Sequence, residues 1–124
     1  MPKNVCTPLF TPGKNVSVIL TANVVGKTFV DVSAAPDVNG TIKAATAAAG
    51  ARAFGVAAYD GATGELIPAI RGGIVPVTAG GTIAVGADVE VGAAGKAITL
   101  ASGKAVGKAV KAGTNGADVL IALY

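Results

Sequence analysis

Glycine residues divide most of this chain into short apolar runs, and this punctuation restricts the possible folds more than any other feature. The 18 glycines separate runs of a few residues that are rich in Val, Ile and Ala. Such runs are too short for amphipathic helices and are typical of strands bounded by turns. After residue 50 the expected strands are 54–59, 66–70, 74–78, 82–85, 89–91, 97–100, 105–111 and 119–124. Short strands at regular spacing predict an all-β fold, either a small β-barrel or a β-sandwich.

The first expected strand alternates apolar and polar residues over 15–23. Strict alternation of this kind is typical of a strand with one buried face. The same parity resumes beyond Gly26 and continues to Val32. The whole segment is therefore either a hairpin or one long strand bent at that glycine.

A second turn is expected at Asn39 and Gly40, because this pair suits the positive φ angles of tight hairpin turns. A strand should follow over 41–46. Residues 44–53 are rich in Ala, the best helix former, but Gly50 interrupts them and no amphipathic stripe appears. We expect at most a short helical turn there.

Two prolines lie inside expected strands, Pro68 and Pro76. Proline has no amide donor, which places each strand at a sheet edge or near a bulge. Exposed edges need to be covered, and this favours assembly with neighbouring molecules.

The first 14 residues contain three prolines and no sustained alternation. We interpret residues 1–14 as an extended N-terminal arm that ends in a turn over 11–14. Residues 15–124 are expected to form a single β domain, because a chain of this length supports one core. Apolar residues make up 52% of the chain, which suggests that some surface is hidden against neighbours.

An internal strand-turn-strand repeat relates residues 52–70 to residues 104–123. Gly55 and Gly107 occupy the same place in the two units and are expected to allow close backbone approach within a strand. A Gly-x-x-Gly loop follows in each unit. Beyond one inserted residue the aligned pairs are Glu65 with Asp118, Leu66 with Val119, Ile67 with Leu120, Ala69 with Ala122, and Ile70 with Leu123. The alternative is a chance match in a chain rich in Ala and Gly.

The residues needed for common catalytic and metal chemistry are missing. The chain has no histidine, and its one cysteine, Cys6, cannot form an internal disulfide. Asp88 and Glu90 share one face of an expected strand, but no histidine, tyrosine or third carboxylate lies near them in sequence. We therefore expect no enzymatic activity, no bound metal and no cofactor.

Three further patterns have simple structural interpretations. Gly26-Lys27-Thr28 lacks the earlier glycine of a phosphate-binding loop and is interpreted as a turn. No convincing helix follows Gly72-Gly73 or Gly80-Gly81, so both pairs are interpreted as loop residues rather than dinucleotide sites. The lysines that could form a basic patch are Lys96, Lys104, Lys108 and Lys111. With few aromatics and no arginine stripe beside them, they indicate a solvated face, and no nucleic-acid partner is expected.

Membrane association is also not expected. No apolar run approaches the roughly 18 residues of a membrane-spanning helix, and the first residues lack the apolar segment of a signal peptide. Synthesis in the cytoplasm is expected.

The central and C-terminal residues resemble the phage capsid cement proteins, small β proteins rich in Ala, Gly and Val. In that family a Gly-Val-Ala strand, a glycine loop and a Gly-Val-Val-type strand recur. The matching segments here are 54–58, 61–64, 71–77, 79–89 and 102–109. The resemblance covers roughly residues 50–124, and the N-terminal third matches only in character.

The resemblance implies a structural virion protein that binds the outer surface of a tailed-phage icosahedral capsid. Its partner would be the major capsid protein, and it would act as a homo-oligomer, with a trimer as the expected state. It would reinforce the shell against internal DNA pressure. The arm residues expected to contact the capsid or a neighbouring subunit are Pro2, Lys3, Asn4, Val5, Leu9 and Phe10.

Two other classes fit the same β pattern. One is a fibre or adhesin-type binding module that recognises a host surface through exposed glycine loops, although few aromatics are present to stack on sugars. The other is a different phage structural subunit, such as a tail-tube component.

Overall fold

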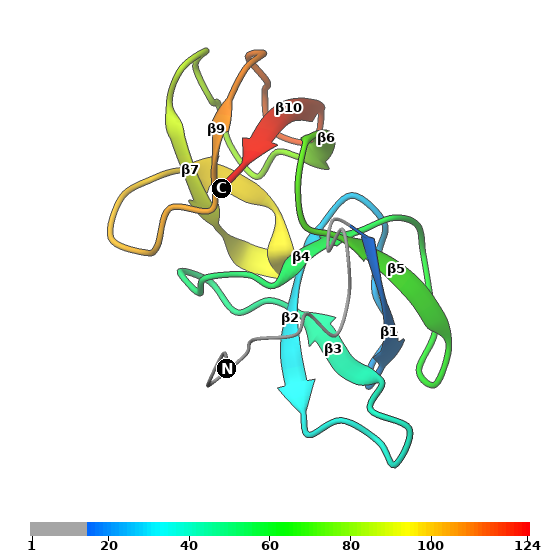
Figure 1. The fold of residues 1–124 in the computed structure, drawn as a ribbon. Helices are drawn as coiled ribbons and strands as arrows, with labels where there is room; N and C mark the ends of the chain where they lie inside the picture. Colours follow the sequence, from blue (N-terminus) through cyan, green and yellow to red (C-terminus); the bar gives the residue numbers. More distant parts are fainter. Residues whose placement is uncertain (1–14) are drawn as a thin grey trace, which may run out of the picture.

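Short β-strands make up nearly all the regular structure of residues 15–124, the part of the chain that this computed structural model describes (Figure 1). The ten strands are β1 (Asn15–Leu20), β2 (Phe29–Ala34), β3 (Ile42–Thr46), β4 (Gly55–Ala57), β5 (Leu66–Ile70), β6 (Ile74–Thr78), β7 (Asp88–Val91), β8 (Ala97–Thr99), β9 (Gly107–Ala109) and β10 (Asp118–Leu123). One 3₁₀ turn, η1, spans Ala93–Gly95. The predicted all-β class is confirmed, whereas the predicted N-terminal arm lies outside the described residues.

The first five strands close into a barrel in the order β1-β3-β2-β4-β5. Strands β1 and β3 pair in parallel, and the other neighbours are antiparallel. The alternation predicted for β1 is present, with Val16, Val18 and Leu20 buried. Closure leaves this half without a free sheet edge, so its strands need no external partner.

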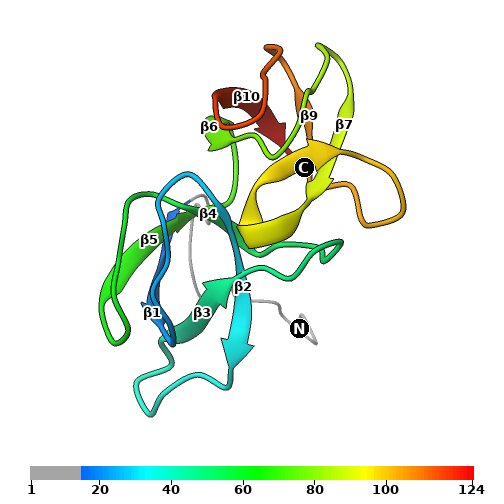
Figure 2. The same ribbon diagram turned by 180° about the vertical axis from the view of Figure 1, so that it is seen from behind.

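The last five strands form a second sheet in the order β6-β10-β9-β7-β8, which lies beside the barrel in both views (Figures 1 and 2). The strand pairs of this sheet correspond to those of the barrel with every strand number raised by five, so that β2–β4 in the barrel corresponds to β7–β9 here. The closing contact is reduced to one parallel bridge between Ala79 and Ala97. Among the described strands, β6 and β8 therefore remain the edges of this sheet.

Backbone hydrogen bonds show that the two halves have the same topology in detail. The matching bonds are Leu20 N to Glu65 O and Ala79 N to Ala117 O, Gly64 N to Leu20 O and Gly116 N to Ala79 O, and Val24 N to Gly61 O and Ile83 N to Gly113 O. Val18 lies opposite Ile67 in the barrel, and Val77 lies opposite Val119 in the second sheet. Ile67 and Val119 are thus equivalent, 52 positions apart like Gly55 and Gly107. The inserted residue in the sequence alignment is therefore wrong. The backbone offset between the two units stays at 52 residues after the glycine loops, although the side chains there align better with a shift of one.

Gly55 and Gly107 lie where strands approach too closely for a side chain, as predicted. A Cβ atom on Gly55 would come 2.8 Å from the carbonyl oxygen of Ile70, and one on Gly107 would come 2.5 Å from the side chain of Ile121. Both glycines are buried, so a side chain there has no route to solvent.

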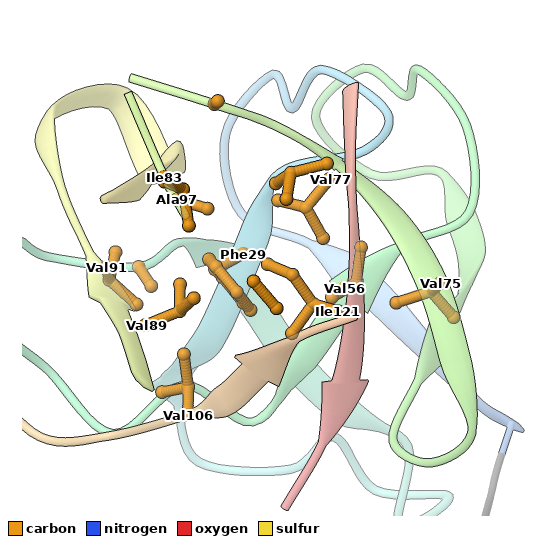
Figure 3. Close-up of a cluster of buried hydrophobic side chains, with 14 residues drawn as sticks. Phe29, Val56, Val75, Val77, Ile83, Val89, Val91, Ala97, Val106 and Ile121 are labelled. Atoms are coloured by element: carbon orange, nitrogen blue, oxygen red, sulfur yellow. The ribbon is translucent and has the colours of Figure 1, made fainter. Parts of the chain in front are cut away.

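Two clusters of buried apolar side chains form the interior. The barrel cluster comprises Val18, Leu20, Val24, Val30, Ala44, Ala57, Ile67 and Ala69. The larger cluster belongs mostly to the second sheet but includes Phe29, Ala47 and Val56 from the barrel half (Figure 3). Adjacent residues of a strand point to opposite faces, so Val30 fills the barrel while Phe29 enters the other cluster. The two halves consequently share a core.

Two predictions about strands are wrong. Strands β1 and β2 form neither a hairpin nor one bent strand, because β3 lies between them in the barrel. The alternation of apolar residues that continues from one strand to the other reflects which side chains are buried, and it does not determine which strands pair. Residues 82–85 form a loop rather than a strand, with one isolated bridge between Ile83 and Gly113.

The predicted turn at Asn39 and Gly40 is confirmed. Gly40 has φ +80°, and the flanking strands β2 and β3 pair antiparallel. The carboxylate of Asp37 accepts hydrogen bonds from the N–H groups of Asn39 and Thr41, at 2.9 and 3.0 Å. Residues 44–53 contain the end of β3 and a turn, and no helix. Turn chemistry therefore outweighed the helix propensity of alanine in this region.

The two prolines differ in outcome. Pro76 lies in β6, an edge strand, as predicted. Pro68 lies in β5, between β1 and β4, so an edge position for it is wrong. The carbonyl of Pro68 accepts a hydrogen bond from Ala58, one residue beyond the end of β4 at Ala57. The ladder between β4 and β5 ends at the pair Ala57 and Ala69, so the amide hydrogen that Pro68 lacks would lie beyond it.

Candidate interaction surface

A groove lies where the barrel half meets the second sheet, and we call it the junction groove. Its walls are Arg52, Ala53, Phe54, Arg71, Ala105, Val106 and Tyr124, and its volume is about 150 Å³. Residues 52–54 precede β4, and residues 105–106 precede β9. These two loops are equivalent in the internal duplication, and the hydrogen bond from Lys104 N to Gly50 O, at 3.1 Å, holds them together.

Arg71 is held in a defined orientation at this groove. Its Nε donates a hydrogen bond to the carbonyl oxygen of Phe54 at 2.9 Å, and its Cζ lies 4.4 Å from the centroid of the Phe54 ring. Stacking of a guanidinium on an aromatic ring is attractive through the quadrupole of the ring. The fixed side chain therefore presents its terminal nitrogens without having to be ordered first.

Tyr124 also lines the groove and is itself anchored. Its hydroxyl donates a hydrogen bond of 2.7 Å to Oδ1 of Asp88. This bond raises the pKa of Tyr124 above the ordinary value of 10.0, and reduced hydration and the negative charge of Asp88 act in the same direction.

The Asp88–Tyr124 bond predicts a measurable change in titration. In a Tyr59→Phe background, in which Tyr124 is the only phenol left, the phenolate absorbance should appear at a pH above 10.0. Adding Asp88→Ala should lower that midpoint. Because the raised pKa belongs to the folded state, the stabilising effect is fully present below pH 10.0 and is lost as the pH rises through the folded-state value. An unchanged midpoint after Asp88→Ala would show that the bond does not form in solution.

A second contact between the halves involves Lys27. Its Nζ lies 2.9 Å from Oδ2 of Asp118 in β10, and its carbonyl accepts a 2.9 Å hydrogen bond from Thr78 of β6. Val25 and Tyr59, which are 64% and 55% exposed, lie at the adjoining open hollow. The charge of this lysine is already paired within the molecule, so it is not free to attract an anionic partner to the hollow.

Asp88 and Glu90 share a strand but do not act as a pair. Asp88 is exposed and bonded to Tyr124, whereas Glu90 is 4% exposed and accepts a hydrogen bond of 2.8 Å from the N–H of Ala101. The other carboxylate oxygen of Glu90 lies beside Gly50 and Gly103. Glu90 thus supports the two loops that lead into the junction groove.

The remaining candidates from the sequence have structural roles. Gly26, Lys27 and Thr28 form a turn in which Thr28 Oγ1 donates to the carbonyl of Val25 at 2.6 Å, as predicted. No helix follows residues 72–73 or 80–81, in agreement with their interpretation as loops. Within residues 15–124 no group of three or more possible metal ligands comes together. No helix of the described part is long and apolar enough to cross a membrane.

The candidate contact residues of the arm, together with Cys6, lie outside the described residues. The junction groove was not predicted from the sequence, because its walls come from four separate segments spread between residues 52 and 124. One signal was present: the chain has only two arginines, Arg52 and Arg71, and both lie at this groove.

Comparisons with known proteins agree with this architecture. A family model described as phage cement protein matches residues 10–123. A solved structure of the head fiber gp8.5 N base of bacteriophage phi29 has the same fold, with a TM-score of 0.75 and 23% sequence identity. That similarity covers 89% of this chain and 92% of the phi29 chain. No curated protein sequence matches the chain.

Proposed function

Because this chain belongs to the phage cement protein family, we propose that it binds the outer surface of a tailed-phage icosahedral capsid and stabilises the shell. The observation that carries this proposal is the family match, which extends over residues 10–123. In this role the protein is a structural virion component whose partner is the major capsid protein. It turns over no substrate and is made in the host cytoplasm before it docks.

The mechanism is binding linkage. A protein that binds the assembled shell, and not its dissociated subunits, stabilises the shell by mass action. At a free concentration of 100 times Kd, each site contributes about 2.7 kcal/mol, so many copies reinforce a capsid even when each binds modestly.

The assembled unit is proposed to be a homo-oligomer, with a trimer as the expected state. The open edges β6 and β8 and exposed apolar residues such as Ile74 and Val85, at 61% and 66% exposure, support association. Each copy consists of one β domain, residues 15–124, preceded by the arm.

Purified protein mixed with undecorated capsids tests the proposal directly. Sedimentation of the particles gives the bound copy number, and calorimetry gives the melting temperature of the capsid. Saturable binding at a simple multiple of the capsid subunits, with a raised melting temperature, is the expected result. Protein sedimented without capsids provides the blank, and a failure to bind would overturn the proposal.

A second candidate is a base module for a fibre, because the phi29 structure with this fold is the N base of a head fiber. The same experiment separates the two functions. A fibre base that contacts a single capsid subunit, and so binds the assembled and dissociated subunits equally, would bind at saturation and leave the melting temperature of the capsid unchanged.

Deleting residues 2–10 is expected to weaken capsid binding. These residues contain the proposed contacts of the arm, and loss of an anchoring segment typically costs about tenfold or more in affinity. The melting temperature of the shortened protein is measured alongside, so that a loss of binding is separated from a loss of folding. Equal capsid binding by the deleted and full-length proteins would remove the arm from the binding mechanism.

A further inference from the structure

We propose that the junction groove binds a carboxylate side chain from an acidic segment of the capsid subunit. The inference rests on the proposed function and names the surface and the chemistry that would carry it. Both arginines of the chain face this groove, one from the loop before β4 and one from the residue after β5. The hollows beside Lys27 and beside Lys111 have no arginine in their walls.

The arrangement of Arg71 favours a carboxylate partner. Its Nε is occupied by the carbonyl of Phe54, and no other hydrogen bond of this guanidinium occurs among residues 15–124. The two terminal nitrogens are therefore available as a fork, and this geometry matches the two oxygens of a carboxylate. Stacking on Phe54 fixes the plane of the fork, so little conformational entropy is lost on binding.

Neither arginine is neutralised within the described part of the molecule. The ion pair found there joins Lys27 to Asp118, in a different hollow. The carboxylate of Asp88 accepts a hydrogen bond from Tyr124, which lines the groove, and is not bonded to an arginine. The groove thus carries unpaired positive charge beside the apolar side chains of Ala53, Ala105 and Val106, which suits an acidic residue flanked by small apolar ones.

The size and charge of the groove argue for a protein side chain over a drug-sized anion or nucleic acid. Its volume of about 150 Å³ lies below the roughly 300–1,000 Å³ of typical small-molecule sites. Nucleic acid requires a stripe of basic residues that follows a phosphate backbone, and among residues 15–124 this wall has only two cations. A single projecting Asp or Glu side chain is the occupant that fits both limits.

Capsid-binding titrations of matched variants test the inference. The double variant Arg52→Ala/Arg71→Ala is compared with the unmodified protein and with Lys111→Ala, which removes an exposed charge at the other end of β9. We expect the double variant to bind undecorated capsids about tenfold or more weaker, and Lys111→Ala to bind within about twofold. Arg71→Lys should fall between them, because an ammonium keeps the charge but lacks the fork.

The outcomes separate failure of this inference from failure of the proposed function. If the unmodified protein does not bind capsids, the proposed function fails. If it binds and the double variant binds equally well, the groove is not the contact and the function stands. A change in the oligomeric state of the double variant, measured by analytical ultracentrifugation, would assign the groove to contacts between copies and overturn the capsid assignment. Unchanged melting temperatures of the variants establish that the fold is intact.

Discussion

Replacing Phe29 with alanine is expected to lower the free energy of unfolding by about 3–5 kcal/mol. Phe29 is among the largest fully buried side chains and is 1% exposed. It arises from β2 of the barrel but packs in the cluster of the second sheet, among residues such as Val77, Val89 and Ile121 (Figure 3). Alanine would leave a cavity where the two halves meet, so contacts of both halves would be lost together.

Thermal or urea unfolding measures this effect, and the melting temperature should fall by at least about 10 °C. Phe29→Leu provides the matched control, because it keeps most of the apolar volume and should cost less than half as much. Val38→Ala, at a position that is fully exposed, should change stability by no more than about 0.5 kcal/mol. A single transition in all variants is expected if the halves share one core. A loss below about 1 kcal/mol in Phe29→Ala would mean that this core is not packed as described.

Local signals predicted the strands well where turn residues flank them. Strands β5 and β6 begin and end at the expected residues, because charged residues or paired glycines bound two runs rich in Ile and Val. The turn at Gly40 was predicted for the same reason. The loop over 82–85 was wrongly assigned, since its alternation involves only Ile83 as a buried residue. Local pattern therefore located most strands but also assigned one to a loop at 82–85.

Pairing between strands was not accessible from the same signals. The parallel contact of β1 with β3 separates β1 from β2, and no property of either strand indicates it. The repeat of residues 52–70 and 104–123 was visible because both segments kept their glycines. The correspondence between β1–β3 and β6–β8 was not visible in the sequence, because these strands have equivalent pairing patterns but different side chains. Topology was thus preserved where sequence similarity was not.

The duplication also explains how the junction groove acquired its composition. Phe54 and Val106 are equivalent, 52 positions apart, and both line the groove. Arg71 is likewise equivalent to Leu123, which lines a smaller neighbouring pocket that shares Arg71 and Tyr124 with the groove. The barrel half therefore supplies both arginines and the stacking ring, and the second half supplies Ala105, Val106 and Tyr124. Two copies of one topology with different side chains have produced a polarised surface that neither copy would form alone.

Replacing Gly107 with alanine is expected to destabilise the fold by about 1–3 kcal/mol, although the change adds one methyl group. The new Cβ would lie 2.5 Å from Cγ2 of Ile121 and 2.7 Å from the carbonyl oxygen of Ala122. The side chain of Ile121 is fully buried, and the carbonyl belongs to the backbone of β10, so neither atom has room to move away. Strands β9 and β10 would have to separate, and their ladder hydrogen bonds would lengthen.

Gly81→Ala is the matched control for this effect. A Cβ atom at position 81 would meet no atom of residues 15–124 within 4 Å, and the backbone there has no positive φ. Alanine at this position should therefore be neutral or stabilising by up to about 1 kcal/mol, through reduced freedom of the unfolded chain. Urea unfolding of both variants measures the difference. The equivalent change Gly55→Ala should resemble Gly107→Ala, since its Cβ would meet the carbonyl oxygen of Ile70 at 2.8 Å. Equal stability of the variants at 81 and 107 would contradict the close strand packing on which the duplication depends.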